Sequence, residues 1–424
     1  MGPSSRAAQR PARTLSGRGT TAMLLDWWPQ ELPAGTRATT TPLITFDGAV
    51  TKGVLYERGP RETVVALMHP RQDLLRARQV PGLLEAGFAV WAQNSRDVGN
   101  DLQLCHENTL LDVAAGMEHL RELGFAHVVL LGISGGAALY TYYTEQSLLA
   151  PDERAAREPS GRPTPLPDAP MPGPDALALV APHPGQGRLL MGMIDPSVTD
   201  EADRLSRDPK LDPYSAHNGF SAAGSRYEPA FVVRYRAAQE ARVARIDERA
   251  REAVADAQQA RGAWKERQEL EDLCRSVALP ILVTYRTDAD LRTTDLSLDP
   301  SDRAYGSIMH PRPQVGNYGV TGFGRLTTPH AWLSTWSGHS ALAATERAAA
   351  GVTVPALVVE YTGDQSVFPG DVARLLQALG SDDIEHQRVR ADHFGRPLAD
   401  GEPDGTALAV EHIARWARAR FGGG

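Results

Sequence analysis

Residues 132–136, Gly-Ile-Ser-Gly-Gly, form the segment whose residue types and spacing most directly suggest chemistry. They match the pattern G-x-S-x-G, in which a serine occupies a sharp turn between a strand and a helix. An apolar run from His127 precedes the motif, and a helical pattern from Ala137 follows it. We therefore interpret Ser134 as a nucleophile, with the Gly135 N–H facing a developing oxyanion at the start of the helix. The alternative is a glycine-rich turn that carries an incidental serine.

The elements that would position this turn follow from alternating apolar and helical patterns. Strands are expected at residues 63–68, 88–92, 127–132, 176–181, 354–361 and 384–389, after a hairpin around Asp47-Gly48, and the continuous apolar run at 63–68 is typical of a buried strand. Helical patterns between them predict a parallel sheet. The proline-rich residues 151–174 are expected to form a loop, and residues 225–276 to form one very long helix or a helix pair.

With this G-x-S-x-G turn and these alternating strands and helices, the chain resembles the α/β-hydrolase family over residues 40–184 and 350–420. The resemblance implies an α/β fold: a mostly parallel α/β-hydrolase sheet with helices on both faces, and a large, mainly helical cap inserted between strands 6 and 7. The expected domains are an N-terminal arm at residues 1–37, a core at 38–184 and 350–424, and the cap at 185–349.

The same resemblance implies an acid and a base for Ser134. The segment from Gly363 to Pro369 is similar to the family's G-D-x-x-V-x-P loop after strand 7, which makes Asp364 the expected triad acid. His393 follows the eighth expected strand, where the family carries its catalytic histidine. Glu360 and His386 are the alternatives, and both lie inside their strands. No metal site is predicted, because the histidines of the insert are not spaced in the sequence as the ligands of a metal ion are.

The loop after the third expected strand supplies an oxyanion donor in this family. Here it is His69-Pro70-Arg71, and Pro70 has no N–H, so the backbone N–H of Arg71 is the expected donor beside that of Gly135. We expect the Arg71 side chain either to line the mouth of the site or to lie on the surface. Phe323, Trp332 and Trp336 are candidate apolar walls of a substrate pocket, with cap core as their alternative role.

Composition limits the classes of partner. The chain has 424 residues, with 44 basic and 52 acidic side chains, and this acidic balance argues against nucleic-acid binding. It lacks an apolar run long enough to cross a bilayer, and its two cysteines favour a reducing, cytoplasmic location. Residues 1–25 carry four arginines and no acid, which is typical of a tail or a transit peptide, and Met23 is a candidate native start.

The expected activity is therefore hydrolysis of a carboxylic ester or lactone through an acyl-enzyme, without a cofactor. The long helical insert and the His-Pro pair resemble bacterial lactonases that act on macrocyclic polyketide lactones such as zearalenone. The alternatives are a carbon–carbon bond hydrolase or an acyltransferase on the same fold, and a non-catalytic binding protein. The long helical segment is either a solvated helix, a scaffold for the cap, or a contact in a homo-oligomer.

Overall fold

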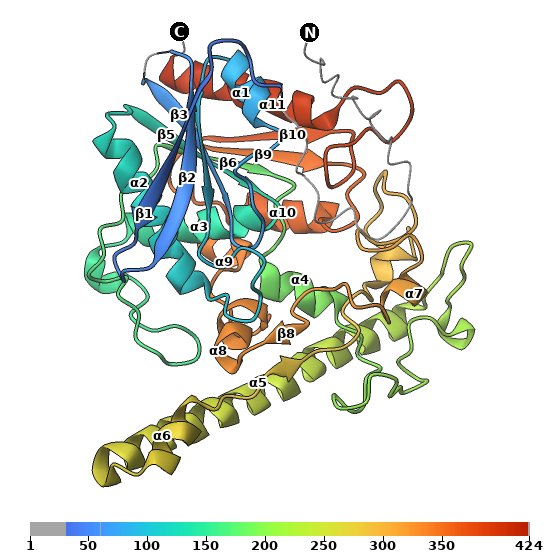
Figure 1. Ribbon diagram of the computed structural model, residues 1–424. Helices are drawn as coiled ribbons and strands as arrows, with labels where there is room; N and C mark the ends of the chain where they lie inside the picture. Colours follow the sequence, from blue (N-terminus) through green and yellow to red (C-terminus); the bar gives the residue numbers. More distant parts are fainter. Residues whose placement is uncertain (1–30, 60, 423–424) are drawn as a thin grey trace, which may run out of the picture.

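The computed structural model describes residues 31–59 and 61–422, so most of the predicted N-terminal arm lies outside the described residues. Its centre is an eight-stranded sheet with the strand order β1-β2-β4-β3-β5-β6-β9-β10 (Figure 1). The strands are β1 (Arg37–Ile44), β2 (Val50–Glu57), β3 (Thr63–His69), β4 (Ala89–Asn94), β5 (His127–Ile133), β6 (Ala176–Val180), β9 (Ala356–Tyr361) and β10 (Ile384–Val389). All neighbours pair in parallel except β1 with β2 and β2 with β4.

The apolar runs form the buried middle of this sheet. Every residue of β3, β4, β6 and β9 is buried, as expected for strands that are covered on both faces. The antiparallel edge is the predicted hairpin, and it turns at Gly48, whose φ of +81° is accessible to glycine without strain. Strand position and direction therefore agree with the sequence-based expectation of a mostly parallel sheet.

Helices cover both faces of the sheet. Side chains of α2, α3, α9 and α10 share one hydrophobic cluster with alternate strand residues, and side chains of α1 and α11 share the cluster on the opposite face. These helices are α1 (Val80–Glu85), α2 (His106–Glu122), α3 (Gly135–Leu148), α9 (Thr345–Ala349), α10 (Pro369–Ala378) and α11 (Gly405–Phe421). The layers and the strand order are those of an α/β-hydrolase sheet, which confirms the predicted fold class.

The long segment between β6 and β9 is mainly helical and has apolar clusters of its own. Its helices are α4 (Gln186–Met193), α5 (Pro229–Arg267), α6 (Leu270–Val277), α7 (Pro313–Gly316), α8 (Pro329–Ala331) and a π-helical turn (Trp332–Trp336). A small sheet pairs β7 (Leu282–Val283) with β8 (Leu326–Thr327), and α5 crosses below the main sheet as one long rod (Figure 1). Short 3₁₀ turns complete the chain at Pro151–Glu153, Ala216–Asn218 and Leu291–Thr293.

This segment forms the cap that the fold class includes, and we keep residues 185–349 as its proposed limits. The 39-residue α5 followed by α6 accounts for the helix predicted over residues 225–276. At the end of the range, α9 packs on the sheet rather than with the rest of the cap, because Ala348 and Ala349 belong to a cluster of the core. Within the described residues, no helix is long and apolar enough to span a membrane.

One contact between the cap and the core involves the fully buried carboxyl group of Glu107, at the start of α2. The Ser334 hydroxyl of the cap donates to Glu107 Oε2 and accepts the backbone N–H of His106 at 3.1 Å. The other carboxylate oxygen of Glu107 has no hydrogen-bond partner among the described residues. Burial raises the pKa of Glu107 to about 7, although the Ser334 hydrogen bond opposes the shift.

We expect Glu107→Gln to become more stable relative to the wild type as the pH rises. The pKa of Glu107 is raised in the folded chain, so its protonated form is stabilising at low pH, and this contribution is lost between about pH 4.5 and pH 7. Glutamine stays uncharged over that range. Urea unfolding of both proteins should show the difference in free energy growing by up to about 1.4 kcal/mol per pH unit. A difference that does not change with pH would contradict an ionisable, buried Glu107.

Candidate active site

Ser134 lies on a strained turn between β5 and α3. Its φ is 53° and its ψ is −120°, a conformation that non-glycine residues rarely adopt and that is typical of functional positions. The flanking glycines are required by close backbone contacts. A Cβ on Gly132 would lie 2.7 Å from the Ala137 Cα, and a Cβ on Gly136 would lie 2.5 Å from the Met68 carbonyl oxygen. The turn therefore holds the Ser134 side chain at the carboxyl end of the central strand.

Two side chains from neighbouring strand ends form a hydrogen-bonded chain with Ser134. The Ser134 Oγ is 2.9 Å from His393 Nε2, and His393 Nδ1 is 2.6 Å from Asp364 Oδ2. The second oxygen, Asp364 Oδ1, accepts the backbone N–H groups of Ser366 at 2.7 Å and Val367 at 2.9 Å. Asp364 is thus buried and held on both oxygens, so it can orient the imidazole and accept its Nδ1–H.

The sheet register brings the acid loop and the histidine loop together. Strands β9 and β10 end side by side, with Val389 paired to Tyr361. Beyond them, the Gly363 N–H donates to the Ala391 carbonyl oxygen at 2.9 Å. Glu360 and His386, the alternatives considered from sequence, pair with each other at 3.1 Å on these strands. The structure therefore joins Asp364, rather than Glu360, to the histidine beside Ser134.

The oxyanion donor expected after β3 differs in the structure. The Arg71 N–H donates to His69 Nδ1 at 3.0 Å, and the Gln72 N–H donates to the same atom at 3.0 Å. The Arg71 backbone donor is therefore already used, which corrects its assignment as an oxyanion donor. The Arg71 side chain forms two hydrogen bonds of 2.6 Å with Asp101 and lies over aromatic rings of the cap, so it is held between the core and the cap rather than free on the surface.

The three aromatic residues expected to wall the pocket pack inside the cap. Trp332 and Trp336 are completely buried, and Phe323 is nearly so. The Trp332 indole N–H donates to Asp247 at 2.7 Å, while the Arg71 guanidinium lies 5.1 Å from the ring centre of Phe323 and 4.8 Å from that of Trp336. These contacts fit the alternative role, cap core, and the expected role in substrate binding stays a prediction.

A small pocket of about 50 Å³ opens at Ser134 and is lined by other residues. The lining combines Ser134, His393 and His69, the first residue of the expected oxyanion loop, with side chains to which the sequence assigned no role: Gln72, Leu74, Ala77, Arg78, Gln79, Ile133, Tyr361 and Phe394. Phe394 could have been suspected, because it directly follows His393. Residues 72–79, between the His69-Pro70-Arg71 loop and α1, carry no motif, so only the folded chain identifies those of them that line the pocket.

No protein family model matches this chain, and no curated protein matches it. Among solved structures, the DcsB complex with its substrate analogue is similar with a TM-score of 0.46 and 12% identity, over 91% of this chain and 100% of that one. The α/β hydrolase GrgF from Penicillium sp. sh18 has a TM-score of 0.46 and 11% identity, over 91% and 99% of the two chains. An esterase domain from a Rhodothermus marinus protein has a TM-score of 0.42 and 11% identity, over 90% and 98%. At these scores and identities, the similarity assigns neither an activity nor site residues to this chain.

Buried histidines surround the turn that carries Ser134. Burial, reinforced by the charges of neighbouring basic groups, lowers the pKa of His69 well below its ordinary value and that of His183 to about 3. Burial also lowers the pKa of His106 to about 4. All three imidazoles are therefore neutral at pH 7. The described residues contain no group of three or more His, Cys, Asp or Glu side chains arranged to hold a metal ion.

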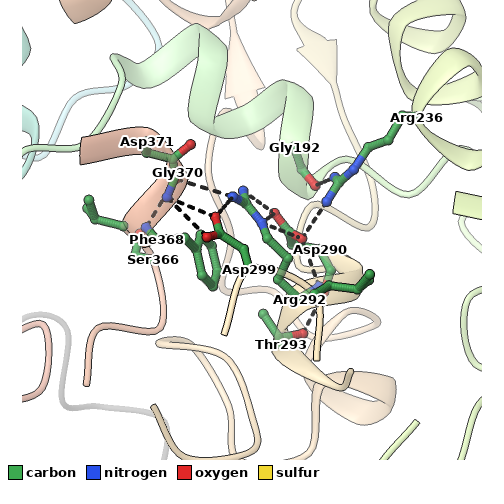
Figure 2. Close-up of polar contacts among 12 residues, drawn as sticks. Gly192, Arg236, Asp290, Arg292, Thr293, Asp299, Ser366, Phe368, Gly370 and Asp371 are labelled. Atoms are coloured by element: carbon green, nitrogen blue, oxygen red, sulfur yellow. Dashed lines mark hydrogen bonds and ion pairs between the residues drawn. The ribbon is translucent and has the colours of Figure 1, made fainter. Parts of the chain in front are cut away.

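An ion-pair cluster in the cap holds the helix that follows the Asp364 loop (Figure 2). The Arg292 guanidinium lies 3.7 Å from the ring centre of Phe368, pairs with Asp290 at 2.8 Å, and reaches Asp371 of α10 at 3.3 Å. The carboxylate of Asp299 accepts the Gly370 N–H at 3.1 Å. Although burial alone would raise the pKa of Asp290, Arg236 and Arg292 hold it well below its usual value. The cap thus positions the chain immediately after Asp364.

We expect Arg292→Met to lower the free energy of unfolding by about 3–5 kcal/mol, because it leaves buried carboxylates without their shared cation. Urea denaturation would measure this loss. Arg415→Met is a control: Arg415 pairs with Glu385 at 3.3 Å, but the two side chains are 62% and 29% exposed, so the expected loss is at most about 1 kcal/mol. Equal losses in the two variants would contradict a special role for Arg292.

Proposed function

We propose that this protein is a serine hydrolase that cleaves a carboxylic ester or lactone. The observation that carries the proposal is the chain of contacts from Ser134 to His393 to Asp364, at 2.9 and 2.6 Å, on a strained strand-to-helix turn. These residues come from three separate strand ends, and a structural role would not require a reactive hydroxyl on such a turn.

In the proposed mechanism, Ser134 Oγ attacks the substrate carbonyl carbon while His393 Nε2 takes the hydroxyl proton. Asp364 holds the Nδ1–H tautomer and stabilises the imidazolium that forms. The oxyanion of the tetrahedral intermediate accepts the Gly135 N–H at the start of α3. The imidazolium then protonates the departing alcohol, and a water molecule activated by His393 releases the acid from the acyl-enzyme in the same manner.

The pocket guides the choice of substrate. Its volume of about 50 Å³ is far below the roughly 300–1,000 Å³ of sites that enclose a whole drug-sized ligand. Leu74, Ile133 and Phe394 give it an apolar wall beside Ser134. These features favour an apolar ester whose short acyl group enters the pocket. A macrocyclic lactone, the finer expectation from sequence, would keep most of its ring outside this pocket.

A serine-directed fluorophosphonate probe tests the proposal, with the labelled peptide identified by mass spectrometry. We expect labelling at Ser134 and hydrolysis within a panel of nitrophenyl esters with acyl chains of two to twelve carbons, together with small and macrocyclic lactones. Mass analysis of the products separates hydrolysis from acyl transfer and from carbon–carbon cleavage. Absence of both labelling and turnover would refute the serine-hydrolase assignment.

A further inference from the structure

Three side-chain nitrogens converge beside Gly135, the residue after the proposed nucleophile. A Cβ placed on Gly135 would lie 2.8 Å from His69 Nε2, 2.7 Å from Gln186 Nε2 and 3.1 Å from His183 Nε2. All three side chains are at least nine-tenths buried. The Gln186 amide lies beside the buried His106 imidazole, but neither of its polar atoms has a well-formed hydrogen bond among the described residues. Buried polar groups gathered in this way next to Gly135 require an explanation.

The proton on His69 can be located from its backbone contacts. Its Nδ1 accepts the N–H groups of Arg71 and Gln72, both at 3.0 Å, so Nδ1 carries the lone pair. In a neutral imidazole the proton is then on Nε2, which makes that atom a hydrogen-bond donor. Burial keeps the pKa of His69 well below its ordinary value, so this neutral donor persists at pH 7.

The position of His69 places its side chain in the pocket that also contains the reacting Ser134. His69 is the last residue of β3, which pairs with β5, the strand that leads to Ser134. His69 lines the pocket together with Ser134 and His393, whereas His183 and Gln186 are not among its lining residues. The Gly135 nitrogen is about 2.5 Å from its own Cβ position, so it lies at most about 5.3 Å from His69 Nε2. Two donors at that separation can share one oxygen at about 2.9 Å from each.

We propose that the His69 side chain is a catalytic residue that donates its Nε2–H to the substrate oxyanion, in place of the backbone N–H of Arg71. The proposal rests on the serine-hydrolase function given above. When Ser134 Oγ bonds to the carbonyl carbon, the π electron pair moves to the carbonyl oxygen, which then accepts the Gly135 N–H and the His69 Nε2–H. When the intermediate collapses, that pair re-forms the C=O bond, and the alcohol leaves with the proton held by His393. His69 gains and loses no proton.

This arrangement explains why Arg71 and Gln72 turn their N–H groups inward. They fix the tautomer and the ring orientation of His69, so the donor is oriented before substrate arrives. A neutral imidazole is suited to this task because it polarises a carbonyl oxygen without placing a net charge in a buried site.

Two substitutions separate the donor at Nε2 from the acceptor at Nδ1. His69→Asn keeps an oxygen near the Nδ1 position, which can accept the loop N–H groups, but it has no donor at the Nε2 position. His69→Gln places an amide N–H near the Nε2 position but gives up the loop acceptor. We expect His69→Asn to lower kcat about 10²–10³-fold with little change in KM, and His69→Gln to retain at least about tenfold more activity than His69→Asn.

The affinity for a trifluoromethyl ketone, which forms an oxyanion on Ser134, should fall in parallel with kcat for His69→Asn, while the melting temperature stays close to that of the wild type. Wild-type kcat in His69→Asn would overturn the proposal, as would a greater loss in His69→Gln than in His69→Asn. Those outcomes leave the serine-hydrolase function intact when the wild type is labelled at Ser134 and hydrolyses esters. If the wild type does neither, the function and the role of His69 both fail.

Discussion

Ser134→Ala is expected to lower kcat on the best ester substrate by about 10⁶-fold. Removal of Oγ eliminates the atom that forms the acyl-enzyme, and with it the hydroxyl that lies 2.9 Å from His393 Nε2. The fluorophosphonate probe should no longer label the protein. Steady-state hydrolysis of a nitrophenyl ester measures the effect, with the protein concentration high enough to detect the residual rate. A variant with more than about one hundredth of wild-type kcat would rule out Ser134 as the nucleophile.

Ser134→Gly provides a matched comparison for the same position. The φ of 53° and ψ of −120° strain any residue with a Cβ, and strain of this kind costs about 1–3 kcal/mol. Both variants lack the hydroxyl, so Ser134→Gly should be as inactive as Ser134→Ala. Because glycine removes the strain, Ser134→Gly should unfold at a higher urea concentration than Ser134→Ala. Lower stability in the glycine variant would argue against strain at this turn.

Asp364→Asn is expected to lower kcat by about 10⁴-fold while leaving the fold intact. Asparagine keeps an oxygen that can accept the N–H groups of Ser366 and Val367, as Asp364 Oδ1 does. The atom that replaces Oδ2 becomes an N–H donor, and it faces His393 Nδ1. The histidine must then carry its proton on Nε2, where it can no longer accept the proton of Ser134. Ester hydrolysis and circular dichroism of the same preparation would measure both properties.

Glu360→Gln is the control for this prediction. Glu360 lies on the strand that leads to the Asp364 loop, but it pairs with His386 and Arg388, not with His393. Its replacement should therefore leave kcat within a few-fold of the wild type. Comparable losses in the two variants would show that charge on this strand, rather than a carboxylate at His393, supports the reaction.

The order of strands and helices could be predicted from local pattern alone. The largely apolar runs of β3, β6 and β9 have a composition and length typical of strands that are buried on both faces, so their type could be predicted without distant residues. The glycine-rich turn at Ser134 is equally local, since its backbone contacts at Gly132 and Gly136 exclude larger residues. The cap was predicted as an insertion and a long helix, but its internal packing was not.

The cap and the oxyanion loop show why the rest could not be predicted. Whether Trp336 lines a pocket or packs against Arg71 depends on contacts between residues more than two hundred positions apart. Whether the backbone N–H of Arg71 is available to an oxyanion depends on the orientation of the His69 ring, which accepts that N–H. The spacing of residues in the sequence does not determine the orientation of a ring. These outcomes are set by competition among burial, hydrogen bonds and ion pairs across the folded chain.

The sequence by itself determined the fold class, the turn that presents Ser134, and the two loops that carry Asp364 and His393. Each of these depends on short-range periodicity or on a motif within a few residues. Only the tertiary structure decided that the backbone N–H of Arg71 donates to the His69 ring. It also brought the side chains of His69, His183 and Gln186 together beside Gly135. The physical reason is that a hydrogen bond between distant segments forms only after the sheet register has brought the ends of β3, β5 and β6 together.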